Sequence, residues 1–98
     1  MAMRPEDMPA PAWERFEALQ SHFLAGLAAR WQQIRLAPQD AIFHDGLHRL
    51  VGSAGVYGFD QLSQLARQAE RLAASGDAGE LTLAMQTLEQ EVRRLAAP

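Results

Sequence analysis

The fold of this chain is decided by residues 44–59, which read His-Asp-Gly-Leu-His-Arg-Leu-Val-Gly-Ser-Ala-Gly-Val-Tyr-Gly-Phe. The segment holds two of the three histidines and four of the seven glycines. Its apolar residues Leu47, Leu50 and Ala54, with Phe43 just before it, recur at spacings of three and four, which predicts a helix with one buried face. Glycine inside a helix costs roughly 0.5–1 kcal/mol relative to alanine. A helix with several interior glycines is therefore expected to need bare backbone.

The interior glycines fall on two sides of this predicted helix. At the helical rotation of about 100° per residue, Gly46 flanks the apolar stripe, which predicts close packing against a neighbouring helix. Gly52 and Gly55 fall on the opposite side, together with His44 and His48, and are expected to face solvent. Because helical side chains lean toward the N-terminus, the residue at 52 would normally cover His48. A glycine there leaves the imidazole open to another macromolecule.

Amphipathic patterns on both sides of this segment predict three more helices. Proline, aspartate and glycine residues mark the ends of all four predicted helices. The first is expected from Pro11 or Ala12 to Pro38, and the second from Pro38 to Gly58. The third is expected from an N-cap at Asp60 to Ser75–Gly76, and the fourth starts at Asp77. Short loops between amphipathic helices imply antiparallel neighbours. The predicted fold is all-α: an antiparallel up-down four-helix bundle in residues 12–98, after a mobile N-terminal leader in residues 1–11.

Composition limits the classes of function. A chain of 98 residues, of which 48% are hydrophobic, is expected to form one domain with a modest core. The absence of cysteine excludes disulfides and thiolate metal sites. A net charge of −3 disfavours general nucleic-acid binding, and no apolar run is long enough to span a bilayer. Without a signal-peptide pattern either, the sequence predicts a cytoplasmic protein that binds neither nucleic acid nor membrane.

The residues around His48 resemble the histidine-containing phosphotransfer (HPt) domain family. The resemblance is carried by His48-Arg49-Leu50-Val51-Gly52-Ser53-Ala54, followed by Gly58-Phe59 and by leucines at 62 and 65. The family pattern has a histidine, any residue, an aliphatic residue, usually lysine or arginine, a glycine and two small residues. The resemblance is strong over residues 40–75. The chain departs from the pattern at Val51, where the family usually has a basic residue.

The resemblance implies a phosphorelay intermediate of two-component signal transduction. His48 would accept a phosphoryl group from a receiver-domain aspartate on Nε2 and pass it to another receiver, and Glu70 would hold Nδ1. The chain would be a monomeric carrier, not an enzyme, without cofactor, bound metal, nucleotide binding or autokinase activity. Its partners would be receiver domains of response regulators or hybrid sensor kinases. The expected contact residues are His44, Asp45, Arg49, Val51, Gly52, Gly55 and Arg67.

Other interpretations of the same residues stay open at the level of sequence. An exposed histidine on a helix is most often a solvated polar residue, and Glu70 could simply pair with Arg67 or Arg71. Val51 favours an alternative function, a helical interaction module without phosphotransfer, such as a degenerate HPt domain or a dimerising bundle. His44 and His48 also have the i,i+4 spacing of metal ligands, although a lone pair is a weak signal.

Overall fold

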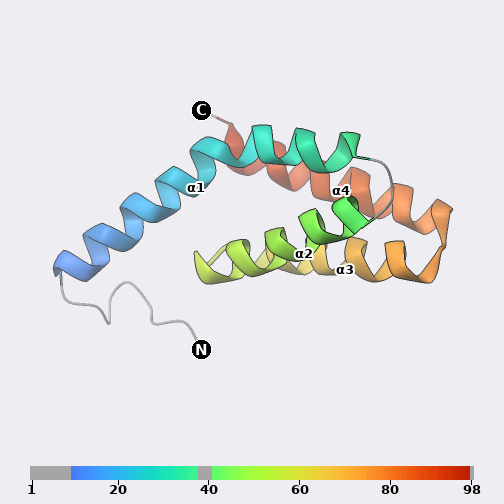
Figure 1. Ribbon diagram of the computed structural model, residues 1–98. Helices are drawn as coiled ribbons and strands as arrows, with labels where there is room; N and C mark the ends of the chain where they lie inside the picture. The colour runs from blue at the N-terminus through green and yellow to red at the C-terminus, as the bar shows by residue number, and fades with distance from the viewer. Residues whose placement is uncertain (1–9, 38–40, 98) are drawn as a thin grey trace.

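The four helices form an antiparallel bundle. The computed structural model describes residues 10–37 and 41–97, and these ranges contain four helices and no strand: α1 (Ala10–Leu36), α2 (Ala41–Val56), α3 (Asp60–Ser75) and α4 (Ala78–Ala96). Successive helices run in opposite directions and pack against each other, and α4 returns to α1 (Figure 1). The predicted all-α, up-down four-helix fold is therefore confirmed.

The first helix is much longer than the others. α1 has 27 residues, against 16 in α2, 16 in α3 and 19 in α4. Its N-terminal half projects beyond the C-terminal end of α4 (Figure 1). There Gln20 Nε2 donates a hydrogen bond of 2.7 Å to the Tyr57 carbonyl oxygen. The Phe23 ring also lies against the rings of Tyr57 and Phe59, with centroids 5.5 and 5.4 Å away. The turn after α2 is thereby attached to α1.

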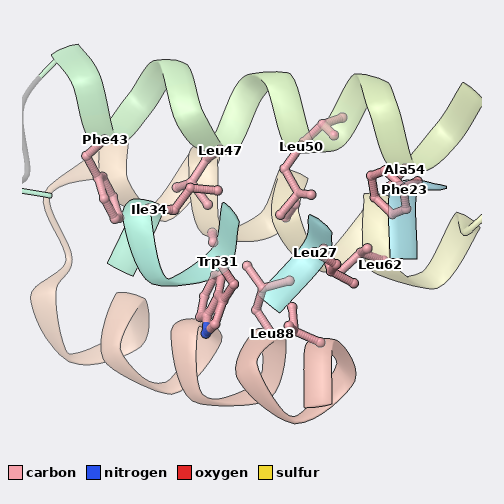
Figure 2. Packing of buried hydrophobic residues seen from close by; sticks show 14 of the residues in the cluster. Phe23, Leu27, Trp31, Ile34, Phe43, Leu47, Leu50, Ala54, Leu62 and Leu88 are labelled. Atoms are coloured by element: carbon pink, nitrogen blue, oxygen red, sulfur yellow. The ribbon is translucent and has the colours of Figure 1, made fainter. Parts of the chain in front are cut away.

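The core lies between the inward faces of all four helices (Figure 2). The apolar stripe that predicts α2 is buried, since none of its side chains is more than 2% exposed. The other helices contribute Leu27, Trp31 and Ile34 from α1, Leu62 from α3 and Leu88 from α4. Burial of this stripe fixes the orientation of α2, and with it the side of the helix that faces away from the core.

Two glycines in the left-handed conformation end the middle helices. Gly58 has φ of +84°, its N–H donates to the Gly55 carbonyl, and the Phe59 N–H donates to the Ala54 carbonyl at 2.8 Å. This pair of bonds is a Schellman motif, which satisfies the last carbonyl groups of α2. Gly76 has φ of +80° and ends α3. Both predicted helix ends are therefore confirmed. Glycine suits these two positions because a side chain would strain a backbone with positive φ.

The N-terminal ends of the helices agree only in part with the predictions from the sequence. Asp77 caps α4, and its Oδ1 accepts a hydrogen bond of 2.9 Å from the Glu80 N–H, as predicted. The prediction that α3 starts at Asp60 is confirmed, but the prediction that Asp60 caps the helix is wrong. Phe59 occupies the capping position without a side-chain hydrogen bond, and Asp60 is the first helical residue. The Asp60 carboxylate still lies in the first turn, where the helix dipole favours negative charge.

The start of α1 lies two residues inside the range predicted for the leader. Ala10 and Pro11 belong to α1, whereas residues 1–9 lie outside the part of the chain that the structure describes. The predicted boundary at Pro38 also lies outside the described residues. No helix within 10–37 or 41–97 is both long and apolar enough to cross a membrane.

Gly46 allows α1 and α2 to approach each other. A Cβ atom at this position would lie 3.0 Å from Ile34 Cγ1 on α1. Real Cβ contacts are almost never tighter, so a larger residue would require the Ile34 side chain or the two helices to shift. The predicted close packing at Gly46 is confirmed.

Candidate functional site

His48 presents an oriented imidazole on the outer surface of α2. Its neighbours Leu47 and Leu50 are buried, which turns His48 outward, and its side chain is 74% exposed. Nδ1 lies 2.8 Å from Oε2 of Glu70, which α3 supplies from the adjacent flank. An ionised carboxylate can only accept a hydrogen bond, so in the neutral imidazole Nδ1 carries the proton and Nε2 keeps its lone pair. The site therefore combines a fixed tautomer with a nucleophilic nitrogen at the surface.

The surface next to His48 is left open by Gly52. Gly52 lies one turn beyond the histidine and is exposed, and a Cβ atom built there would meet nothing within 4 Å. The bare backbone is therefore not required by packing inside the bundle. The opening predicted from the sequence is present, and a second protein can approach the imidazole across it.

Gly55 differs from the expectation that it faces solvent. It is half-buried, and a Cβ atom there would lie 3.5 Å from Ser63 Oγ on α3. The reason is that α3 packs closely along this flank of α2, which a helical wheel of α2 alone does not reveal. Gly55 therefore belongs to the α2–α3 interface, where an added Cβ atom would be in ordinary van der Waals contact with Ser63.

Val51 also differs from the expected contact surface. Its side chain is only 8% exposed and packs in the core. Val51 therefore belongs to the core and offers almost no side-chain surface to a partner. A lysine or arginine at this position would have to extend its charged group from this apolar environment to the solvent.

The remaining expected contact residues lie around His48 in different settings. Arg49 Nε contacts Asp45 Oδ2 at 2.9 Å, one turn apart on the exposed side of α2. His44 is half-buried, and its ring meets the Phe43 ring edge-on. Arg67 is exposed on α3. In the described part of the chain, neither Arg67 nor Arg71 forms an ion pair with Glu70, whose partner is His48.

Sequence reasoning missed Ser63, a buried residue of α3 that binds the backbone of α2 near His48. Its Oγ donates a buried hydrogen bond of 2.8 Å to the Val51 carbonyl oxygen. Ser63 and Glu70 are seven residues apart, so both lie on the face of α3 that contacts α2. The sequence does hold a sign of this role, because Ser63 is a polar residue at a position of α3 that faces the core. No group of three or more potential metal-ligating side chains gathers anywhere in residues 10–37 and 41–97.

Comparison with known proteins identifies the family to which this chain belongs. Residues 15–98 match the Hpt domain family. No curated protein and no solved structure matches the chain. Members of this family are helical bundles that carry phosphoryl groups in phosphorelays and interact with receiver domains. With its four-helix fold, its outward histidine and a match over most of its length, the chain belongs to the Hpt domain family.

Proposed function

We propose that this protein is a phosphorelay intermediate in which His48 accepts a phosphoryl group from a receiver-domain aspartate and passes it to a second receiver. One observation carries the proposal. The exposed His48 imidazole is held through Nδ1 by Glu70 Oε2 at 2.8 Å, which leaves Nε2 directed away from its only side-chain partner among the described residues.

The chemical step follows from this arrangement. The Nε2 lone pair attacks phosphorus, the bond from phosphorus to the aspartyl oxygen breaks, and the aspartate leaves as a carboxylate. The proton on Nδ1 stays in place, so the phosphorylated ring carries a positive charge. The Glu70 carboxylate stabilises that charge and holds the ring in one orientation, in the way that a second residue orients other reactive histidines. The reverse sequence on another receiver returns neutral His48.

The surroundings of His48 assign roles to the neighbouring residues. Gly52 keeps the approach to Nε2 clear, while His44, Asp45 and Arg49 of α2 and Arg67 of α3 border the surface that a receiver would cover. Such docking would be transient and at the small end of interface sizes. The donor and acceptor receivers would belong to response regulators or hybrid sensor kinases. In this proposal the chain acts as a monomeric cytoplasmic carrier, without cofactor, nucleotide binding or kinase activity of its own.

The proposal is tested by transfer from a labelled receiver. Purified receiver domains are phosphorylated with radiolabelled acetyl phosphate and mixed with the protein. The wild type should acquire an acid-labile, base-stable label, and His48→Gln should acquire none. His44→Gln, the same change one turn away on α2, should still be labelled. Labelling of His48→Gln, or no labelling of the wild type by any receiver, would refute the proposal.

The alternative of a helical interaction module without phosphotransfer is not favoured. Its support was the valine at position 51, yet the burial of that side chain accounts for an apolar residue there on packing grounds alone. The family match and the contact between His48 and Glu70 both support a carrier.

A further inference from the structure

A groove runs between α1 and α2 on the flank of α2 that faces away from Glu70. It consists of two adjoining surface hollows of about 530 and 260 Å³, and both are lined by Gly26 and Arg30 of α1. Arg49 and Asp45 of α2 line the larger hollow. Gly26 keeps the groove open, because a Cβ atom there would meet nothing within 4 Å. The groove therefore begins at the residue next to His48 and extends along α1.

The groove has an excess of positive charge although the chain carries a net charge of −3. Arg30 is half-buried and has no carboxylate partner among the described residues. Burial, and then the neighbouring Arg49 guanidinium, lower the pKa of Arg30. Of the described residues that line the larger hollow, Asp45 is the one carboxylate, against the two guanidinium groups of Arg30 and Arg49. Among the described residues that line the groove, one positive charge thus has no compensating carboxylate.

The geometry of the two arginines suits one kind of ligand. Asp45 Oδ2 holds Arg49 through Nε at 2.9 Å, which leaves the two terminal nitrogens of that guanidinium available as donors. Arg30 contributes a second planar fork of donors from the opposite wall. Guanidinium groups bind carboxylates through paired hydrogen bonds, and partial burial strengthens such contacts. An aspartate or glutamate side chain would supply the negative charge that the groove lacks.

We propose that this groove is a docking subsite for a carboxylate on the surface of the receiver partner, bound by Arg30 and Arg49. The inference rests on the proposed function, because the partner that covers His48 and Gly52 is the one placed to reach the groove. Arg49 follows His48 directly and lies about 100° further round α2. The carboxylate contact determines affinity and choice of receiver, whereas His48 and Glu70 perform the transfer.

The test separates docking from chemistry with Arg30→Gln. Transfer from a phosphorylated receiver is measured against protein concentration, and binding of the same receiver without phosphate is measured by titration calorimetry. Arg30→Gln should raise both KM and Kd about tenfold, the order expected for the loss of one charge-assisted contact. The maximal transfer rate should stay within about twofold. Arg30→Glu should weaken binding further, because it would repel the carboxylate.

Arg15→Gln is the matched control, since it removes the same charge from an exposed position on α1 that does not line either hollow. It should bind like the wild type. Higher salt should weaken binding of the wild type more than binding of Arg30→Gln. Equal Kd values for Arg30→Gln and Arg15→Gln would overturn the docking subsite while leaving the phosphotransfer proposal intact. Receiver binding that depends on Arg30 without any transfer would refute phosphotransfer and support the subsite, and no binding by any receiver would overturn both.

Discussion

Ser63 Oγ on α3 donates a buried hydrogen bond of 2.8 Å to the carbonyl oxygen of Val51, three residues beyond His48 on α2. Seven residues further along α3, Glu70 meets His48. These two polar contacts lie on one face of α3 and tie it to α2 at two points. A shift of α3 along α2 would break both, so Ser63 fixes the register that keeps Glu70 opposite Nδ1.

Removal of the Ser63 hydroxyl should weaken this attachment. Ser63→Ala is expected to lower the free energy of unfolding by about 0.5–1.5 kcal/mol, the usual net contribution of one hydrogen bond. Urea unfolding measures the change. Ser53→Ala is the matched control, because Ser53 Oγ bonds to the Arg49 carbonyl within α2 itself at 2.9 Å. The control should stay within about 0.5 kcal/mol of the wild type, and equal losses in both variants would contradict a special role for Ser63.

Glu70→Gln should disturb the imidazole without unfolding the bundle. A glutamine amide can either donate to or accept from Nδ1, so the tautomer of His48 is no longer fixed. Nitrogen NMR of the imidazole should change from one tautomer with hydrogen on Nδ1 to a mixture. Phosphotransfer should slow by about 10- to 100-fold, the range found when other orienting partners of histidine are removed. Glu80→Gln, the same change on α4, should alter neither, and an unchanged tautomer in Glu70→Gln would contradict the orienting role.

The two glycines Gly46 and Gly52 should respond oppositely to alanine. Gly52→Ala places a methyl group in open space and should raise the free energy of unfolding by about 0.5–1 kcal/mol through helix propensity. Gly46→Ala places a methyl group 3.0 Å from Ile34 Cγ1 and should lower it by about 1–3 kcal/mol. Thermal unfolding of both variants checks this. If Gly52→Ala were destabilising, the surface around it could not be as open as described.

Larger residues at Gly52 should separate stability from function. Gly52→Gln keeps α2 helical but covers the imidazole, because a side chain at this position leans toward His48. Transfer from a phosphorylated receiver should therefore fall by at least tenfold, at a melting temperature no lower than that of the wild type. A Gly52→Gln variant that transfers at the normal rate would show that receivers do not approach across this surface.

Stability should depend on pH through Glu91. Glu91 is only 6% exposed, and Arg94 binds both carboxylate oxygens at 2.8 and 2.7 Å. These hydrogen bonds lower the pKa of Glu91, against the opposing effect of burial and with a further contribution from the Arg94 charge. Because the folded pKa lies below the unfolded value of about 4.3, the stabilisation is complete above that value and is lost as the pH falls through the folded pKa.

Glu91→Gln tests this dependence. Urea midpoints of the wild type and the variant should differ most near neutral pH and converge in acid, because the variant has no carboxylate to protonate. A difference that stays constant from neutral to acidic pH would mean that the Arg94 contact does not stabilise the ionised form of Glu91.

The elements predicted well from sequence are those fixed by local chemistry. Gly58 and Gly76 end helices because their backbone conformation excludes side chains, and Asp77 caps α4 with its own carboxylate. The buried stripe of α2 follows from helical periodicity alone. Asp60 was assigned wrongly because the Schellman turn at Gly58 continues through Phe59 and places that residue at the cap.

The surroundings of His48 were harder to predict from helical periodicity. Periodicity gives the direction of a side chain from its own helix, but it does not say which neighbouring helix lies on that side. Helical periodicity places Gly55 on the open side of α2, and the family resemblance places Val51 among the contact residues, whereas Gly55 lies against α3 and Val51 lies in the core. The pairing of His48 with Glu70 came from the family resemblance, since the register of α3 against α2 depends on the turn and on Ser63.

The position of α2 between two different neighbours has a consequence for how such a protein can change. Glu70 and Ser63 bind α2 from the α3 flank, and the arginine-lined groove lies on the α1 flank. The residues proposed for phosphotransfer and those proposed for partner choice thus lie on opposite flanks of one helix. If both proposals hold, substitutions on the groove face of α1 would change which receiver binds without moving the imidazole, so partner choice could be redesigned independently of the transfer chemistry.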